Sequence, residues 1–369
     1  MASRRPFESL YVHVPFCHGK CSYCAFYSLG RYGRTEQESY SRRILQDMEK
    51  QSEDCAALRS VFIGGGTPTA LDDDLFERLL TGIRSRFRFA DDLEWTVESN
   101  PESLSGQKIA IMAAHGVTRV SMGVQSFEPR IRTTLGRCGH LEDLETKVDA
   151  LRQAGIRHVN FDFIYNVPGQ TLEDFRLDLH KALLFKSDHL SAYALTIEEG
   201  TPLAAHGTSV NDDDFPEYWR LADEILMEGN LRRYEISNFS KSGCECRHNN
   251  DIWHGGTYLG IGPAATSFDG MDRWTQVANL SKWLDGAEAG KDILPSDKRD
   301  AEILAFGMRT VDGWTWRQFS ESVGIDAKTL RGKELERLER LGLVTIDDNG
   351  FRPTAHGLLF NDDIVMELL

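Results

Sequence analysis

The feature that most constrains this chain is a set of three closely spaced cysteines near its N-terminus. Cys17, Cys21 and Cys24 form a C-x3-C-x2-C pattern directly after an apolar stretch. Thiolates hold the irons of iron–sulfur clusters, and cubane clusters usually take four protein thiolates. Three thiolates therefore leave one iron of a [4Fe-4S] cluster open to an external ligand. The pattern predicts such a cluster, with these three residues as its ligands.

A structural zinc site is the alternative for the same cysteines. Tetrahedral zinc takes a fourth Cys or His at a compatible spacing, and C-x3-C-x2-C is not the usual zinc pairing. His18 lies between two of the cysteines, where it is badly placed to join them. The chain has seven cysteines, an odd number, which fits a reducing compartment better than a disulfide scaffold. We therefore favour the cluster over zinc, disulfides or free thiols.

Composition excludes several other classes of protein. The 369 residues carry 57 acidic and 42 basic side chains, for a net charge of −15. This balance argues against binding to nucleic acid or to anionic membranes. No apolar run approaches the roughly 20 residues of a membrane helix, and the N-terminus lacks a signal-peptide core. We expect a cytoplasmic protein without a transmembrane segment.

Short apolar segments alternate with helical patterns along the first two-thirds of the chain, which predicts an α/β fold with a parallel sheet. Closure of the sheet into a full or partial (β/α) barrel is the expected architecture, and barrel enzymes place their chemistry at the carboxyl ends of the strands. The expected strands are Leu10–Pro15, Ser60–Ile63, Glu94–Glu98, Arg119–Val124, Val159–Ile164 and His189–Thr196. Their ends carry cysteine, glycine, glutamate, glutamine, aspartate and threonine side chains, which predicts one shared site.

The cysteine pattern resembles the signature of radical S-adenosylmethionine (SAM) proteins, in which SAM fills the open iron position. Tyr-Val-His-Val-Pro-Phe-Cys, Gly-Gly-Gly-Thr-Pro-Thr, Gly-Val-Gln-Ser-Phe and Asn-Phe-Asp-Phe-Ile-Tyr follow in order, as in the coproporphyrinogen III oxidase-like branch. The resemblance implies a SAM-derived radical and a radical SAM partial barrel. It assigns the cluster to the three cysteines and the SAM site to Tyr11, Tyr23, Gly65, Gly66, Thr67, Glu98, Gln125, Arg137 and Asp162.

We expect particular contacts with SAM from several of these residues. The glycine turn allows Gly65, Gly66 and Thr67 to approach the amino and carboxylate groups closely. Arg137 can pair with the carboxylate of SAM. Glu98 and Asp162 can accept hydrogen bonds from ribose hydroxyls or balance a cation, although each taken singly is more often a solvated or capping carboxylate.

Two departures separate the chain from the oxidases of this branch. Those enzymes carry a further cysteine two positions after the third ligand, where this chain has Phe26, and a long N-terminal extension, where only ten residues precede Tyr11. Both departures resemble the sister group of haem chaperones, HemW. The resemblance implies a carrier that binds haem and delivers it to respiratory or other haem proteins. No catalytic residue is assigned, and the sequence leaves a homodimer open.

A segment after the expected strands is the candidate haem site. Cys244-Glu-Cys246-Arg-His248-Asn249-Asn-Asp-Ile252-Trp253 is similar to the H-N-x-x-Y-W motif of the haem chaperones, with Ile252 in place of the tyrosine. Haem iron accepts an imidazole or a thiolate as an axial ligand, and an aromatic ring can stack on the macrocycle. His248 is the expected ligand, and Cys246 is the alternative. Cys244, Cys246 and His248 also make three-quarters of a zinc site, with no fourth ligand evident nearby.

Three parts of the chain are expected: residues 1–240 as the barrel, 241–295 as a barrel extension with the haem segment, and 296–369 as a small winged-helix-like domain. In the last part, three helices precede a hairpin with an Asn-Gly turn. Leu330, Leu335, Leu338 and Leu341 are expected to face inward. The helix that holds them mixes basic with acidic residues, so we do not expect it to bind nucleic acid.

A radical SAM enzyme acting on a tetrapyrrole is the alternative function, as an oxygen-independent coproporphyrinogen III oxidase or a haem-modifying methyltransferase. The SAM motifs keep this alternative open, whereas Phe26 and the short N-terminus favour the carrier. A radical enzyme acting on an unrelated substrate is a third, weaker interpretation.

Overall fold

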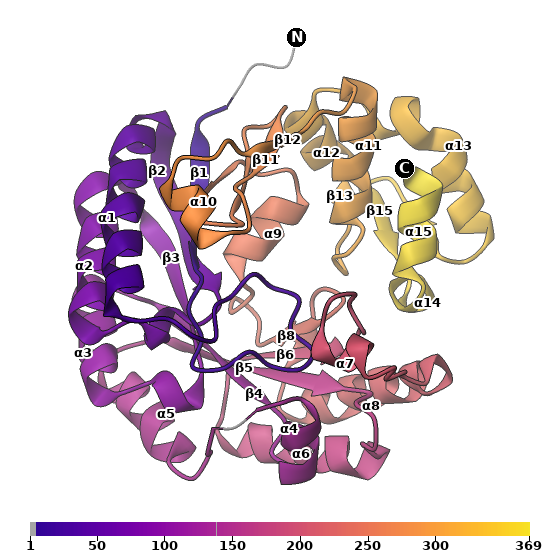
Figure 1. The fold of residues 1–369 in the computed structure, drawn as a ribbon. Helices are drawn as coiled ribbons and strands as arrows, with labels where there is room; N and C mark the ends of the chain where they lie inside the picture. The colour runs from indigo at the N-terminus through magenta and orange to yellow at the C-terminus, as the bar shows by residue number, and fades with distance from the viewer. Residues whose placement is uncertain (1–4, 138) are drawn as a thin grey trace.

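Six parallel strands in consecutive order form the centre of the computed structural model, which describes residues 5–137 and 139–369 (Figure 1). They are β1 (Phe7–Val14), β2 (Cys55–Gly65), β3 (Phe89–Ser99), β4 (Arg119–Gln125), β5 (His158–Tyr165) and β6 (His189–Ala194). All six expected strands are present. Because each strand pairs in parallel with the next, their carboxyl ends meet at one rim of the sheet.

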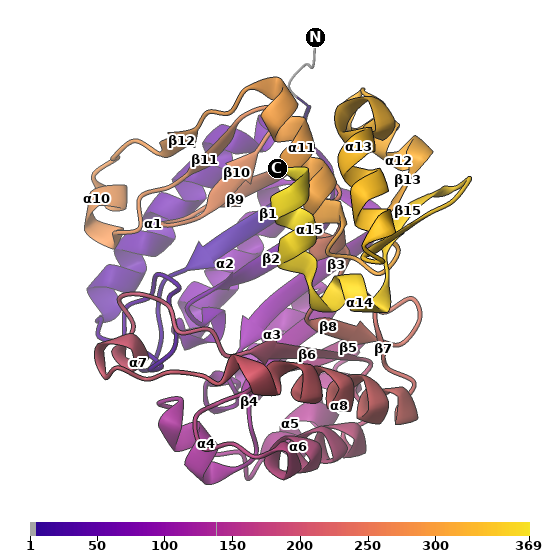
Figure 2. The same ribbon diagram turned by 90° about the vertical axis from the view of Figure 1, so that its right-hand side faces the viewer.

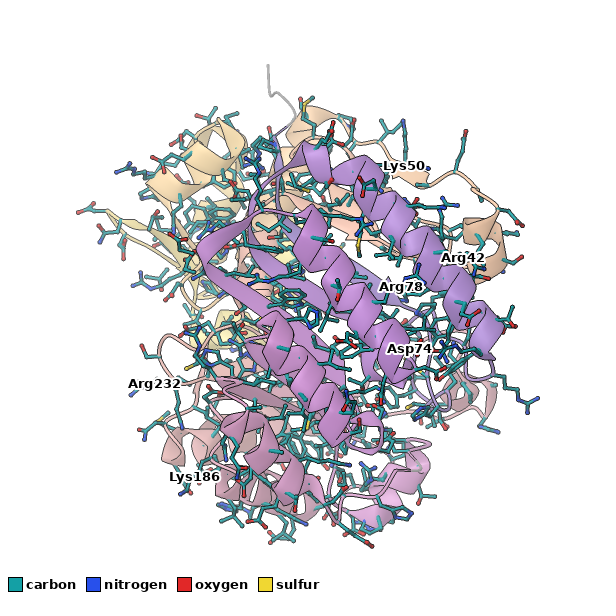
Figure 3. All side chains as sticks on the ribbon, turned by 90° about the vertical axis from the view of Figure 1, so that its left-hand side faces the viewer. Arg42, Lys50, Asp74, Arg78, Lys186 and Arg232 are labelled. Atoms are coloured by element: carbon teal, nitrogen blue, oxygen red, sulfur yellow. The ribbon has the colours of Figure 1, made fainter. Side chains whose placement is uncertain are left out.

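Helices cover the outer face of this sheet, as the alternating pattern predicts (Figure 1). They are α1 (Arg34–Gln51), α2 (Asp73–Arg86), α3 (Gly106–His115), α5 (Leu144–Gln153), α6 (Leu172–Leu184) and α8 (Phe215–Glu228). The short helices α4 (Pro129–Thr134) and α7 (Pro202–Ala205) lie in the loops that follow β4 and β6. Tyr40, Ile44 and Met48 lie on one face of α1 and are buried against the sheet. Charged residues face outward, as Arg42, Lys50, Asp74 and Arg78 show in Figure 3.

The sheet continues beyond both ends of the six-stranded core and stays open. β9 (Tyr258–Ile261) pairs in parallel with β1, and β10 (Thr266–Phe268), β11 (Arg273–Thr275) and β12 (Gly290–Asp292) follow in antiparallel order. At the other edge β8 (Asn238–Ser240) pairs with β6 and with β7 (Arg232–Arg233). The fold is therefore a partial barrel. Short segments α9 (Arg247–Trp253), α10 (Leu280–Leu284) and the 3₁₀ turns Ser52–Asp54, Pro68–Ala70, Pro101–Ser103 and Asp212–Asp214 complete this part.

The C-terminal part has the helices and wing expected from the sequence. It contains α11 (Ser296–Gly307), β13 (Trp314–Thr315), α12 (Trp316–Val323), α13 (Ala327–Arg340), β14 (Val344–Ile346), β15 (Gly350–Pro353), α14 (Ala355–Leu359) and α15 (Asn361–Leu368). Phe268 of β10 belongs to its hydrophobic core, so this part packs against the barrel extension (Figure 2). Leu335 and Leu338 are buried as expected. Leu341 is 59% exposed, because α13 ends one residue earlier and the chain turns away.

The described residues include no helix that combines the length and the apolar character that a membrane crossing requires.

Replacing Trp314 with alanine should destabilise the protein by roughly 3–5 kcal/mol. The indole is 1% exposed, packs edge-on against Phe319 and His254, and donates a hydrogen bond to the carbonyl of Leu304. Urea denaturation followed by circular dichroism measures the change. Met366→Ala is the control, since that side chain is 76% exposed and its loss should cost less than about 0.5 kcal/mol. Equal stabilities of the two variants would contradict the packing described here.

Candidate functional site

A cavity of about 570 Å³ runs through the partial barrel and contains most of the expected site residues. At the carboxyl ends of the strands it is lined by Cys17, Cys21 and Cys24. Its other end is lined by Cys246 and Asn249, beside the first residues of β4 and β6. One hollow therefore joins the cysteine loop to the segment that resembles the haem motif.

The cysteine loop leaves β1 and is fixed at both ends by backbone hydrogen bonds. The amide of Cys17 donates to the carbonyl of Leu29, whose own amide donates to the carbonyl of Pro15. Burial raises the pKa of the thiols of Cys17 and Cys24, so both are held as neutral thiols in the absence of a cation. A bound iron displaces such protons and stabilises the thiolates. Three soft sulfur donors on one wall of the cavity fit the expected cluster.

The glycine turn after β2 needs the small residues that it has. Gly65 has a φ of +109°, and a Cβ atom there would lie 2.6 Å from the ring of His13. A Cβ on Gly66 would lie 2.7 Å from the carbonyl oxygen of Phe16. The amides of Gly65 and Gly66 donate to the Glu98 carboxylate and to the carbonyl of Val14, so both are already bonded within the protein.

Two buried carboxyl groups face each other across the cavity. Burial, followed by the nearby charge of Asp162, raises the pKa of Glu98 to about 8. Burial also raises the pKa of Asp162, although Ser121 and Asn160 donate hydrogen bonds to it at 3.0 and 2.7 Å. Such groups gain from a bound cation or from hydroxyl donors, because both stabilise the ionised form.

Arg137 sits between the cysteines and the strands, at the position where an anionic group of a ligand can be bound. Its guanidinium donates to Asn100 Oδ1 at 2.7 Å, to the carbonyl of Gly123, and to Cys21 Sγ at 3.4 Å. Its Nε and the hydroxyl of Thr96, both on buried parts of residues that line the cavity, have no hydrogen-bond partner among the described residues. Unpaired buried polar atoms are costly. The cavity, with both guanidinium and carboxyl groups in its lining, fits a small zwitterionic cofactor.

The structure brings together most of the residues predicted for SAM. Those that line the cavity are Tyr23, Gly65, Gly66, Thr67, Glu98, Gln125, Arg137 and Asp162. Tyr11 is not among the lining residues, since its hydroxyl bonds to His13 Nδ1 at 3.1 Å and its ring stacks on Phe62.

His248 also lies outside the lining of the cavity. The imidazole is 3% exposed, stacks on Phe62, and bonds through Nδ1 to the hydroxyl of Ser60 at 2.8 Å. Burial lowers its pKa to about 4, so it is neutral at physiological pH, the form that binds iron. Its neighbours Cys246 and Asn249 do line the cavity. The ring of Trp253 is covered by the guanidinium of Arg309, with 5.3 Å between the guanidinium carbon and the ring centroid.

Sequence reasoning missed the polar residues deeper in the barrel. Among them are Asn100, Ser121, Asn160, His189, Ser191 and Tyr193. On β4, β5 and β6 the inward positions are every second residue, as strand geometry requires. Ser121, Gly123 and Gln125 on β4 repeat this spacing, and Asn160 and Asp162 repeat it on β5. A count of polar residues at alternate positions would have found those on β4, β5 and β6, whereas Asn100 directly follows β3.

Comparison with known proteins agrees with this site. The Radical SAM superfamily model matches residues 11–182, and the HemN C-terminal domain model matches residues 294–360. The "Heme chaperone HemW" of Mycobacterium tuberculosis is 33% identical over 99% of this chain and 95% of its own length. That of Escherichia coli K12 is 30% identical over 97% of each chain. This chain belongs to the HemW family of radical SAM proteins. Membership of the superfamily implies a [4Fe-4S] cluster and SAM as cofactors.

A solved structure agrees on the fold. Coproporphyrinogen III oxidase (HemN) from Escherichia coli, described as a radical SAM enzyme, superposes with a TM-score of 0.83 at 23% identity, over 99% of this chain and 90% of the oxidase. The radical SAM partial barrel and the C-terminal domain are thereby confirmed as the fold of this chain.

Replacing Glu98 with glutamine should change how stability depends on pH. The unfolded chain releases this proton near the ordinary pKa of 4.5, whereas the folded protein keeps it up to about 8. The stabilisation from the bound proton is complete below the lower value and is lost as the pH rises between the two. The melting temperature of the cofactor-free variant should therefore fall less than that of the wild type between about pH 5 and about pH 8. Glu336→Gln, on an exposed residue, is the control and should follow the wild type.

Parallel curves for wild type and Glu98→Gln would show that Glu98 ionises at an ordinary pH. Thermal unfolding followed by circular dichroism provides both curves.

Proposed function

We propose that this protein is a haem chaperone, which binds haem and passes it to other haem proteins, respiratory enzymes among them. The observation that carries the proposal is similarity over the whole chain to bacterial proteins named for this function, at 28–33% identity. The acceptors, a homodimeric state and a cytoplasmic location are parts of the same proposal.

Phe26 supports a carrier rather than an oxidase. It stands two positions after the third cysteine, where the oxidases of this branch have a further cysteine. Its ring is 71% exposed and lines the opening of the cavity. An exposed aromatic ring provides apolar surface for a flat macrocycle and cannot act as a thiol.

The cluster and SAM have a defined set of residues in this proposal. Cys17, Cys21 and Cys24 hold the cluster, Arg137 binds the carboxylate of SAM, and Glu98 with Asp162 faces its cationic and hydroxyl groups. When bound, the cluster and SAM together would supply reductive cleavage of a carbon–sulfur bond. The guanidinium of Arg137 also donates a hydrogen bond to Cys21 Sγ at 3.4 Å, so the residue proposed for the SAM carboxylate lies beside one of the cluster cysteines.

For haem we propose an axial ligand from the α9 segment. His248 is already in the neutral form that iron accepts, because burial lowers its pKa to about 4. Its ring has to leave Ser60 and Phe62 to reach the cavity, which requires a shift of α9. Cys246 is the second candidate, since it lines the cavity in the present arrangement.

The alternative function, a radical SAM enzyme acting on a tetrapyrrole, is favoured by one observation. All but Tyr11 of the residues expected to bind SAM line a single cavity. A protein that only carried haem would gain little from keeping this set.

Anaerobically reconstituted protein should bind about one haem per chain and leave coproporphyrinogen III unchanged. An absorbance titration measures haem binding, and fluorescence detection of porphyrins measures turnover in the same preparation. Release of 5′-deoxyadenosine, assayed in parallel, reports whether SAM is cleaved. Rapid SAM-dependent formation of protoporphyrinogen would contradict the carrier function and show that the protein is an oxidase.

His248→Ala should weaken haem binding by about tenfold or more, the size of effect expected for a metal-site residue, and leave the absorption spectrum of the cluster intact. Ser60→Ala is the matched control, because it removes the hydrogen-bond partner of His248 and keeps the imidazole. Unchanged haem affinity in His248→Ala, with a loss in Cys246→Ala, would assign the axial ligand to Cys246.

A further inference from the structure

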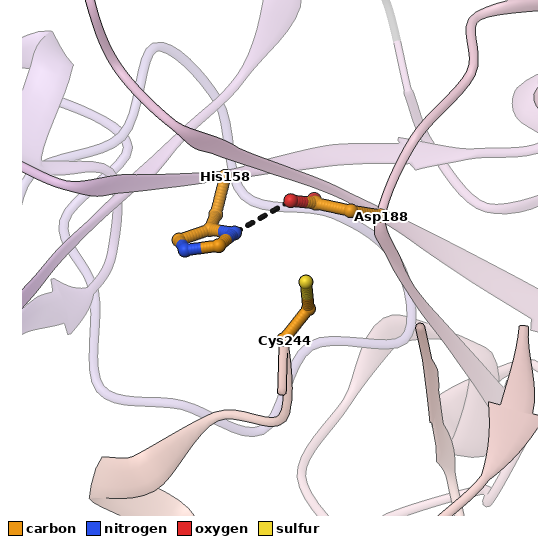
Figure 4. A group of neighbouring side chains, drawn as sticks. All are labelled: His158, Asp188 and Cys244. Carbon is orange, nitrogen blue, oxygen red and sulfur yellow. Dashed lines mark hydrogen bonds and ion pairs between the residues drawn. The ribbon is translucent and has the colours of Figure 1, made fainter. Parts of the chain in front are cut away.

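Three potential metal ligands meet on the outside of the barrel, at the amino end of the strands (Figure 4). A ring nitrogen of His158, a carboxylate oxygen of Asp188 and Sγ of Cys244 all lie within 4.8 Å of one another. We propose that these three side chains bind one zinc ion. The site is separate from the cluster, because none of its members lines the cavity that holds Cys17, Cys21 and Cys24.

The three residues come from distant parts of the sequence that the fold fixes in place. His158 is the first residue of β5, and Asp188 directly precedes β6, the neighbouring strand. Cys244 ends a tight turn whose first residue, Lys241, donates its amide to the carbonyl of Asp188 at 3.0 Å. The amide of Cys244 closes the turn on the carbonyl of Lys241, also at 3.0 Å. The backbone thus holds all three ligands together without a metal.

The carboxylate of Asp188 is oriented toward the other two ligands. Its Oδ1 accepts the amide of Val159 at 3.2 Å, and its Oδ2 lies 2.5 Å from Nδ1 of His158. Zinc sites characteristically fix their ligands through outer hydrogen bonds like that from the Val159 amide. The second oxygen and the imidazole are bonded to each other, and Figure 4 shows Cys244 Sγ pointing toward this pair.

Charge at the site suits a divalent cation. Aspartate and a cysteine thiolate supply two negative charges. The nearest guanidinium, that of Arg119, is directed at the carbonyl of Cys244 at 2.8 Å and at the carboxylate of Glu94 at 3.3 Å. Its positive charge is therefore paired with Glu94. The remaining charged side chains nearby are those of Lys241 and Glu245. Their charges have opposite signs and act on Cys244 in opposite directions.

The donor set selects zinc among common metals. Calcium and magnesium take oxygen ligands, whereas a nitrogen, a sulfur and one carboxylate oxygen suit zinc. Ligands bound to zinc at ~2.0–2.3 Å stand roughly 3.3–3.8 Å apart in a tetrahedron. Zinc binding therefore opens the 2.5 Å hydrogen bond between His158 Nδ1 and Asp188 Oδ2 and draws together the ligand atoms that now lie up to 4.8 Å apart. The fourth position then belongs to water.

This site differs from the zinc set considered from the sequence. Cys246 Sγ lies 3.7 Å from the carboxylate of Glu94, and His248 bonds to Ser60. Only Cys244 of that set stays near other ligands, and its partners come from β5 and the residue before β6. Zinc bound there clamps the turn that leads into α9 onto the barrel.

The experiment uses the full chain, reconstituted anaerobically so that iron occupies the cluster cysteines. The protein is incubated with Zn²⁺, desalted, and its zinc and iron contents are measured together. Titration with Co²⁺ provides a second readout, because a thiolate bound to Co²⁺ gives a charge-transfer absorption. We expect about one zinc per chain in addition to the iron, and displacement of Co²⁺ by Zn²⁺.

Cys244→Ala should lose this zinc and the charge-transfer band while its iron content is unchanged. Cys55→Ala, which removes a buried thiol that belongs neither to the cluster nor to this site, should keep both. Asp188→Asn and His158→Ala should bind Co²⁺ at least about tenfold more weakly. Asp188→Asn keeps the side-chain shape, so it tests the site even if an alanine variant fails to fold. Zinc retained by Cys244→Ala, no zinc in the wild type, or a loss of haem binding in place of zinc binding would overturn the proposal.

Discussion

The cost of placing charged groups inside the barrel determines how the rest of the site is arranged. Glu98, Asp162 and Arg137 all line one cavity away from bulk solvent. Burying an ionised group costs several kcal/mol unless hydrogen bonds or opposite charges compensate it. Asn160 and Ser121 compensate Asp162, and Asn100 holds Arg137. Glu98 receives only the amide of Gly65 among the described residues, and its pKa rises accordingly. A cationic ligand bound in this cavity therefore stabilises the ionised form of Glu98.

The opposite end of the barrel is organised by a second buried ion pair. Arg119 is 3% exposed and lies 3.3 Å from Glu94, whose carboxylate also accepts the amides of Arg247 and His248. Glu94 therefore caps the first turn of α9, where amides lack partners within the helix. Because Arg119 also binds the carbonyl of Cys244, one pair holds the turn and the helix together. The segment that resembles the haem motif is fixed to strand residues.

Sequence reasoning predicted the strands and the cavity well because both follow from local rules. Alternating βα units imply parallel strands, and parallel strands bring Glu98, Gln125 and Asp162 to one hollow. It could not predict the surroundings of His248, since these depend on Ser60 and Phe62, which are distant in sequence. The group formed by His158, Asp188 and Cys244 was missed for the same reason, because three separate segments of the chain meet there only after folding. Leu341 was assigned inward by helical spacing, which fails where the helix ends.

Carriage and catalysis make different demands on a cavity with this shape. A radical enzyme must hold its substrate against the cluster end, where the carbon–sulfur bond of SAM is cleaved. A carrier must instead release its cargo intact, which favours an axial ligand on an element that can move. His248 on α9 is held by the Glu94 carboxylate, the Ser60 hydroxyl and the ring of Phe62. In the proposed carrier, haem binding through His248 exchanges the contacts of its imidazole with Ser60 and Phe62 for the iron. In the proposed arrangement, haem held by α9 is kept apart from Cys17, Cys21 and Cys24 and from the radical chemistry that these cysteines support.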